Sequence, residues 1–299
     1  MKVERHVLAK DRPAVCLDAF FLDDSPEYRS GESKPAVLIC PGGGYLRCSD
    51  READPIALRF LARGYHAFVL RYSTKESGGA RFPSFLEDAA RAMCFIRDTA
   101  KEEHLAPDKI AVCGFSAGAN LAGLLATRWH EGFLSTALGR PNSDFKPAAL
   151  ISAYGMLDWP ALMALAAEDP DAEKREQWGS KMDLWRECNQ TVFGTQNPSQ
   201  EQMTEASPAH NVSMHTPPAF IWHTSSDGLV YPQLSINFAS AMLAHKRPCE
   251  LHLFENGGHG LSLADKTSSG NRWQMDTRAS AWMELCIDWL DTRLFPNMM

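Results

Sequence analysis

The 299-residue chain lacks the sequence features that mark several classes of protein. Its eight cysteines form no Cys-x-x-Cys pair and no cysteine–histidine ligand spacing, so we expect no metal site. No uninterrupted apolar run approaches the roughly 20 residues that a membrane-spanning helix needs. There is no block of lysine and arginine, and the net charge is −7, so we expect neither nucleic acid nor a membrane as a partner.

The N-terminal residues 1–6 contain no apolar segment of the kind found in secretory signal peptides. Several cysteines lie within apolar runs, as buried free thiols do. We therefore expect a cytoplasmic protein with reduced cysteines.

Short apolar runs alternate with longer amphipathic segments along most of the chain. The runs predict strands at 14–20, 35–40, 66–72, 110–114, 148–154, 219–224 and 250–254. The amphipathic segments predict helices at 51–63, 85–104 (with Ser84 as its cap), 116–130, 232–245 and 275–294. Such alternation implies right-handed crossovers and a mostly parallel central sheet flanked by helices, an α/β fold in a single domain, 1–299.

Residues 158–216 interrupt this rhythm. The stretch is polar, and it scatters tryptophans, Trp159, Trp178 and Trp185, and several methionines among charged residues. It predicts a mostly helical cap inserted between two strands of the sheet. We expect the cap to overhang the site described next and to set substrate size, with Trp159 and Trp185 as candidates for lining the pocket.

The segment 110–122 contains Gly-x-Ser-x-Gly, formed by Gly114, Ser116 and Gly118. An apolar run precedes the serine and good helix formers follow it. This context is typical of a nucleophile elbow, in which a strand turns sharply into a helix with the serine at the tip. Glycines are needed because a Cβ two residues before or after the serine would collide with the neighbouring backbone. A glycine-rich turn with an incidental serine is the alternative interpretation.

A serine nucleophile needs a base and a group that orients the base. On this topology the order is serine, acid, histidine, each following a strand. His259, in a glycine-rich loop after the last strand, is the predicted base. Three other histidines fit a structural position better than that of the base. His223 is interpreted as a packed core residue, His252 is expected to face the helix layer, and His130 lies at a helix end.

Asp227, in the loop after the strand 219–224, is the predicted acid. Asp158, which ends the preceding strand, is its rival, and Glu255 is a third candidate. The oxyanion of a tetrahedral intermediate needs hydrogen-bond donors. We expect these from the backbone amides of Ala117, at the helix start, and of Gly43 and Gly44, in the three-glycine loop after the strand 35–40.

The glycine loop 41–45, the segment 114–122, the loop 227–230 and the loop 258–260 together resemble α/β-hydrolases of the esterase/lipase group. The resemblance is to the acetylxylan-esterase-like, carbohydrate-esterase branch. Pro41 stands where the hormone-sensitive-lipase-like branch has histidine.

The resemblance implies an α/β-hydrolase fold and deacylation of small esters through an acyl-enzyme, without a cofactor or a metal. Acetyl esters of sugars or xylo-oligosaccharides are the first expected substrates and generic short-chain carboxylic esters the second. A thioesterase or amidase, a serine peptidase-like hydrolase and a non-catalytic binding protein remain alternatives.

Overall fold

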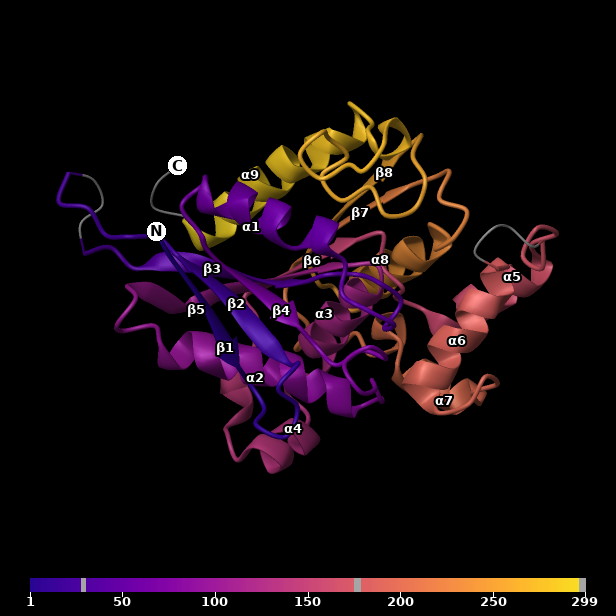
Figure 1. The fold of residues 1–299 in the computed structure, drawn as a ribbon, viewed down its shortest axis with the longest axis horizontal. Helices are drawn as coiled ribbons and strands as arrows, with labels where there is room; N and C mark the ends of the chain where they lie inside the picture. The colour runs from indigo at the N-terminus through magenta and orange to yellow at the C-terminus, as the bar shows by residue number, and fades with distance from the viewer. Residues whose placement is uncertain (28–30, 175–178, 296–299) are drawn as a thin grey trace.

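The computed structural model describes residues 1–27, 31–174 and 179–295. Within them one eight-stranded sheet runs through the molecule, with helices on both faces (Figure 1). In spatial order its strands are β1 (Lys2–Val7), β2 (Cys16–Phe21), β4 (His66–Arg71), β3 (Lys34–Cys40), β5 (Leu105–Phe115), β6 (Ala149–Ala153), β7 (Ala219–Thr224) and β8 (Cys249–Phe254). The strands from β4 to β8 are parallel, and β2 and β1 extend the sheet antiparallel. The predicted fold class is confirmed.

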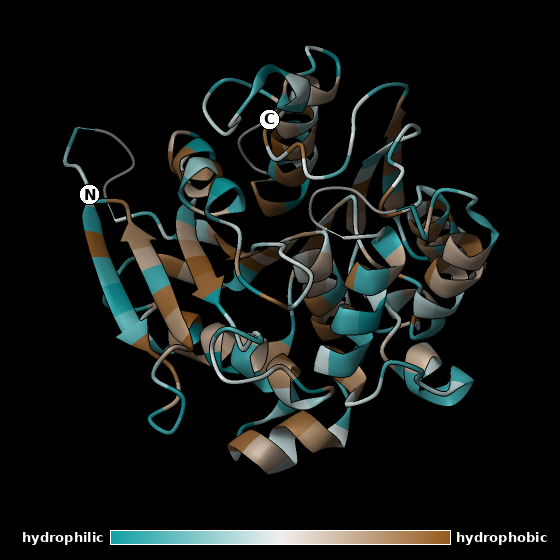
Figure 2. Ribbon diagram, turned by 45° about the vertical axis from the view of Figure 1, so that its right-hand side comes forward, coloured by the Kyte–Doolittle hydropathy of each residue, from teal (hydrophilic) through white to brown (hydrophobic). Residues whose placement is uncertain are grey.

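Burial of the strands follows their position in the sheet. Every residue of β3 and β6 is buried, as expected of central parallel strands covered by helices on both faces. β1 is mostly exposed and β8 only partly buried, because they are the edge strands. In Figure 2 the strand beside the N label accordingly carries hydrophilic residues along most of its length.

Two helix layers complete the core. α1 (Asp54–Leu61) and α9 (Trp282–Leu294) cover one face of the sheet, where Phe60 and Trp282 are fully buried. α2 (Ser84–Asp98), α3 (Ala117–Arg128) and α8 (Gln233–Ala244) cover the other. α4 (Gly132–Leu138) follows α3. The short 3₁₀ helices are η1 (Asp50–Glu52), η2 (Asn142–Phe145), η3 (Pro208–His210), η4 (Arg272–Gln274) and η5 (Ala279–Ala281).

The stretch between β6 and β7 holds α5 (Trp159–Glu168), α6 (Lys181–Phe193) and α7 (Gln200–Glu205), which lie together at one side of the molecule (Figure 1). Its helices form where capping residues start them: Asp158 caps α5, and Ser180 and Ser199 form capping boxes at α6 and α7. Trp178, one of the tryptophans noted in the sequence, lies outside the described residues.

Several element boundaries differ from the sequence predictions. Ser84 does not cap α2: its hydroxyl donates to the carbonyl of Arg81, and Pro83 occupies the cap position. α2 ends at Asp98 rather than near 104, and His104 takes a positive φ just before β5. α9 begins at Trp282 rather than 275, because the Asp276 carboxylate accepts two backbone hydrogen bonds in a local turn that competes with the helix.

All eight cysteines are free thiols. In the described part of the chain, no helix combines the length and the apolar character that crossing a bilayer requires.

Candidate active site

Ser116 stands at the turn between β5 and α3. Its backbone has φ 52° and ψ −118°, a strained conformation for a residue with a Cβ. A Cβ added to Gly114 would lie 2.3 Å from the carbonyl oxygen of Gly118, and one added to Gly118 would lie 2.0 Å from that of Cys40. Only glycine at both positions lets β5, α3 and the end of β3 approach this closely, so the geometry is that of a nucleophile elbow.

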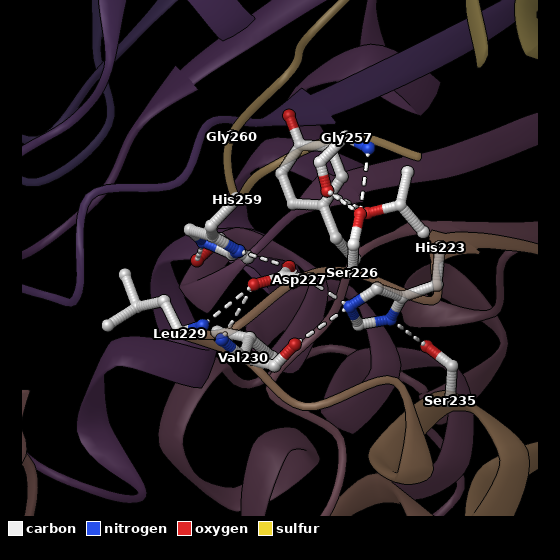
Figure 3. Close-up of polar contacts among 12 residues, drawn as sticks. His223, Ser226, Asp227, Leu229, Val230, Ser235, Gly257, His259 and Gly260 are labelled. Carbon is white, nitrogen blue, oxygen red and sulfur yellow. Dashed lines mark hydrogen bonds and ion pairs between the residues drawn. The ribbon is translucent and has the colours of Figure 1, made fainter. Parts of the chain in front are cut away.

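The predicted serine, histidine and aspartate meet at one edge of the sheet. The Ser116 hydroxyl lies 2.8 Å from Nε2 of His259. On the other side of the ring, Nδ1 of His259 lies 2.7 Å from Oδ2 of Asp227 (Figure 3). They follow β5, β8 and β7, which are parallel, so their carboxyl ends lie at the same end of the sheet, with β6 between β5 and β7. The arrangement provides a nucleophile, a base in reach of its proton and an acid that orients the base.

The loops that carry Asp227 and His259 are bonded to each other. Ser226 accepts a hydrogen bond from the amide of Gly257 at 2.9 Å (Figure 3). The hydroxyl of Thr224 donates to the carbonyl of Gly257 at 2.7 Å. These bonds fix the distance between the acid and the histidine, which lie 32 residues apart in the sequence.

Both oxygens of Asp227 are fully used. Oδ1 accepts from the amides of Leu229 and Val230, at 2.9 and 3.0 Å, and Oδ2 accepts from His259 and from Nε2 of His223, the latter at 3.1 Å. Burial alone would raise the pKa of Asp227, but the charge of His259 and the hydrogen bonds from both histidines hold it well below the ordinary value. Asp227 is therefore ionised throughout the neutral range.

The pKa of His259 is raised above its ordinary value. Burial lowers it, but the negative charge of Asp227 and its hydrogen bond outweigh burial, and Glu52 adds a further negative charge nearby. The surroundings of His259 therefore stabilise its protonated form, the imidazolium.

The rival acids have other contacts. Asp158 accepts hydrogen bonds from the amide of Ala161 at the start of α5, from Asn237 and from His210. It therefore connects the insertion to α8 and does not contact His259. Glu255 is exposed and faces Arg278 at 3.9 Å.

The other histidines are placed as follows. His252 lies at 2.7 Å from Glu250, and His130 lies beside His215. His223 is fully buried, as predicted for a core residue, but it also contacts Asp227, a role that the sequence analysis missed. The signal available was its position four residues before the acid.

Two of the predicted oxyanion donors, Gly43 and Gly44, border the same cleft as Ser116. Gly43 and Gly44 have φ of 126° and 65°, and the carbonyl of Gly43 accepts from the amides of Leu46 and Arg47 in a tight turn. No acceptor for the amides of Gly43, Gly44 or Ala117 exists among the residues that the structure describes. Ala117 begins α3, whose dipole adds positive potential.

A cleft of about 310 Å³ opens over Ser116. Its apolar wall comes from the insertion and the strand-end loops, and its polar wall from the glycine loop and η1. The lining residues are Gly43, Gly44, Leu46, Arg47, Ser49, Arg51, Glu52, Ser116, Met156, Leu184, Trp185, Leu229, His259 and Gly260. Trp185 thus lines the cleft as predicted, whereas the prediction for Trp159 is wrong: it is fully buried and packs edge-on against Phe193. Within the described residues no cluster of acidic, histidine or cysteine side chains is arranged to hold a metal ion.

Comparisons with known proteins agree with this geometry. The chain is 33% identical to MGS-M1, an α/β-hydrolase enzyme from a deep-sea metagenome, with a TM-score of 0.73 over 99% of this chain and 98% of that one. An acetyl ester-xyloside bifunctional hydrolase from Caldicellulosiruptor lactoaceticus is 29% identical, with a TM-score of 0.72 over 93% and 88% of the two chains. Endo-1,4-beta-xylanase B of Butyrivibrio fibrisolvens is 30% identical over 78% of this chain and 33% of its own length.

The chain spans less than two thirds of the length of this xylanase and of two further curated relatives, the esterases LipC and LipQ of Mycobacterium tuberculosis. Residues 24–242 match the BD-FAE family, and they make up more than half of the chain. The chain therefore belongs to the BD-FAE family, within the α/β-hydrolases.

Proposed function

We propose that this protein is a serine esterase that hydrolyses small carboxylic esters. The observation that carries the proposal is the unbroken chain of contacts from Ser116 through His259 to Asp227, beside three backbone amides without acceptors among the described residues. Neither a base in reach of the serine nor a set of free amides is needed by a protein that only binds a ligand.

In the proposed mechanism the hydroxyl oxygen of Ser116 attacks the ester carbonyl while Nε2 of His259 takes its proton. The amides of Gly43, Gly44 and Ala117 stabilise the oxyanion of the tetrahedral intermediate. The alcohol leaves with the proton from His259, and the acyl group stays on Ser116 as an ester. Water, deprotonated by His259, then releases the carboxylic acid and restores the serine. Asp227 holds the histidine tautomer and stabilises the imidazolium.

Acetyl groups on sugars or xylo-oligosaccharides are the proposed substrates. The cleft is small, which favours a short acyl group. The chain is similar to an acetyl ester-xyloside bifunctional hydrolase and to a xylanase. This similarity supports a carbohydrate as the alcohol part of the ester.

Three measurements test the proposal. Nitrophenyl esters of rising chain length, assayed beside acetylated xylo-oligosaccharides, distinguish a sugar deacetylase from a generic short-chain esterase. Parallel assays with thioester, anilide and peptide substrates detect the alternative activities. Ser116→Ala is expected to lower kcat by about 10⁴–10⁶ if the three residues act as a unit. Near-wild-type turnover by this variant would remove Ser116 from the mechanism.

A further inference from the structure

A buried carboxylate links the glycine loop to the loop that carries His259. Glu52 ends η1, eight residues after the three-glycine segment, and it is only 4% exposed although it forms part of the cleft wall. The sequence places Glu52 in the amphipathic helix predicted at 51–63 and gives it no predicted role at the site.

Its two oxygens have different partners. Oε2 accepts from the backbone amide of Gly42 at 2.8 Å, and Oε1 accepts from the hydroxyl of Tyr154 at 2.6 Å. The Tyr154 oxygen in turn accepts from the amide of Ser262 at 2.9 Å. Burial raises the pKa of Tyr154 well above the ordinary value, so its hydroxyl keeps the proton that it donates. We call this chain of four residues the Glu52 bridge.

At one end of the bridge, Gly42 packs against the turn that carries Ser116. Gly42 is packed so closely on the elbow that an added Cβ would lie 2.8 Å from the carbonyl oxygen of Phe115 and 3.0 Å from Cβ of Ser116. Because Gly43 and Gly44 follow directly, a shift of Gly42 would move their amides relative to the serine oxygen. The hydrogen bond from Gly42 to Glu52 holds the first of these glycines in place.

The other end bears on the base. Ser262 lies three residues after His259, and the Tyr154 ring contacts the imidazole edge-on with ring centroids 5.2 Å apart. Arg51 reinforces the same loop, since its guanidinium donates to the carbonyl of Gly260 at 3.0 Å and its carbonyl accepts from the Ser262 hydroxyl at 2.6 Å. The histidine loop is thus fastened to η1 as well as to the loop after β7.

The carboxylate also carries charge. Among the described residues no lysine, arginine or histidine forms an ion pair with Glu52. A negative charge on Glu52 raises the pKa of His259.

We propose that Glu52 is a positioning residue of the active site: it fixes the glycine loop against Ser116 and holds the loop of His259. This inference rests on the proposed esterase function. Glu52 itself does not have to touch the substrate for either effect.

Three variants separate the effect of the hydrogen bonds that Glu52 makes from the effect of its charge. Glu52→Gln removes the charge, and its amide cannot accept from both Gly42 and Tyr154. Glu52→Asp keeps the charge but is one methylene too short to span both donors. Tyr154→Phe breaks the bridge in the middle. Asp88→Asn is the matched control, because Asp88 is also a buried carboxylate that accepts a hydrogen bond from a backbone amide, that of Ser73, but it does not line the cleft.

We expect Glu52→Gln to lower kcat on p-nitrophenyl acetate by about tenfold or more with little change in KM, as for loss of oxyanion stabilisation. The acid limb of its pH profile should move to lower pH. Glu52→Asp and Tyr154→Phe should also lower kcat. The acid limb of their pH profiles should stay closer to that of the wild type. Asp88→Asn should leave kcat and the limb unchanged even where it lowers the melting temperature.

Nuclear magnetic resonance titration of His259 and the rate of Ser116 labelling by a fluorophosphonate provide readouts independent of turnover. A wild-type protein that hydrolyses no ester would overturn the proposed function, while the titration and the labelling would still decide the role of Glu52. Support requires that Glu52→Gln both slows labelling and lowers the pKa of His259. Failure of either change overturns the positioning proposal.

Discussion

His223 and Asp227 form a buried pair behind the proposed active site. Nε2 of His223 lies 3.1 Å from Oδ2 of Asp227, the same oxygen that Nδ1 of His259 contacts at 2.7 Å (Figure 3). The same Nε2 lies 2.9 Å from the carbonyl of Val230, so it faces two acceptors and must carry a hydrogen. Nδ1 is 2.8 Å from the hydroxyl of Ser235. Asp227 is therefore held from both sides by imidazoles.

The first prediction concerns this pair. His223→Leu, combined with Ser235→Ala so that no hydroxyl is stranded, removes one donor from a buried carboxylate. We expect a loss of about 1.5–3 kcal/mol in the free energy of unfolding, the range for a hydrogen bond to a charged group. If the poorer orientation of Asp227 and His259 also raises the activation free energy by about 1.4 kcal/mol, kcat falls roughly tenfold.

Chemical denaturation and steady-state kinetics measure these two effects. His223→Gln keeps a donor at the position of Nε2 and should recover part of both losses. His252→Gln, on the neighbouring strand and without contact to Asp227, is the control. Equal behaviour of the leucine and glutamine variants would show that His223 acts only by filling space.

The second prediction compares the two candidate acids. Asp227→Asn should preserve the fold and lower kcat by about 10⁴, because the asparagine amide favours the wrong tautomer of His259. Asp158→Asn should cost about 1 kcal/mol of stability through the weakened cap of α5, with kcat within a few fold of the wild type. Kinetics and thermal melts of both variants decide the matter, and greater loss of kcat in Asp158→Asn would reverse the assignment.

The third prediction is the pH dependence of kcat/KM. His259 must be neutral to accept the serine proton, and its pKa lies above the ordinary value of about 6.5. Activity should therefore fall as the pH drops through that raised pKa. Asp227, with its depressed pKa, stays ionised over the same range and adds no second step. Removing its charge in Asp227→Asn should lower the pKa of His259 and move the acid limb of the residual activity to lower pH.

The fourth prediction tests the glycine loop with a matched pair. Gly43 and Gly79 share a φ of 126°, but a Cβ on Gly43 would lie 2.2 Å from the carbonyl oxygen of Arg47, whereas one on Gly79 would meet nothing within 4 Å. Gly43→Ala must therefore displace the loop, and we expect kcat to fall by about 10²–10³, as for loss of one oxyanion donor. Gly79→Ala carries only backbone strain, and its kcat should not change. Similar kinetics for the two variants would argue against an oxyanion role for the loop.

The order of strands and helices followed from periodicity, because burial on two faces gives continuous apolar runs such as 35–40 and helical amphipathicity gives the segments between them. Ser116, Asp227 and His259 were candidates from sequence because each follows a strand, and parallel strands bring their carboxyl ends together. Their catalytic roles remain predictions, but their proximity is a consequence of the topology.

Contacts across long sequence distances were not accessible in the same way. Nothing local to Glu52 indicates that Tyr154 and Ser262 converge on it, since the three residues are brought together by separate crossovers. His223 was recognised as buried, yet its polar partner depends on how the loop after β7 folds back. The start of α9 was predicted too early, at residue 275. The Asp276 carboxylate accepts backbone amide hydrogen bonds in a local turn, and this turn forms in place of the first helical turn that the amphipathic pattern predicts.

The last prediction concerns substrate size. Trp185, on α6, is almost fully buried but forms part of the cleft, together with Leu184 and Met156. Replacing it by alanine removes the largest apolar side chain of that wall, so longer acyl chains should be accepted. We expect Trp185→Ala to increase the ratio of octanoate to acetate turnover on p-nitrophenyl esters by about tenfold, because the space left by the indole lets about two further methylenes be buried at about 0.8 kcal/mol each.

Trp159→Ala is the control for this prediction, because Trp159 is equally large and buried in the same insertion but packs against Phe193 instead of lining the cleft. Its loss should cost about 3–5 kcal/mol of stability, as for other large-to-small core changes, without altering the preference among esters. Circular dichroism establishes that both variants are folded before their chain-length profiles are compared. If the two variants give the same profile, whether shifted or unshifted, the wall formed by α6 does not select the acyl group, and selectivity must come from the glycine-loop side of the cleft.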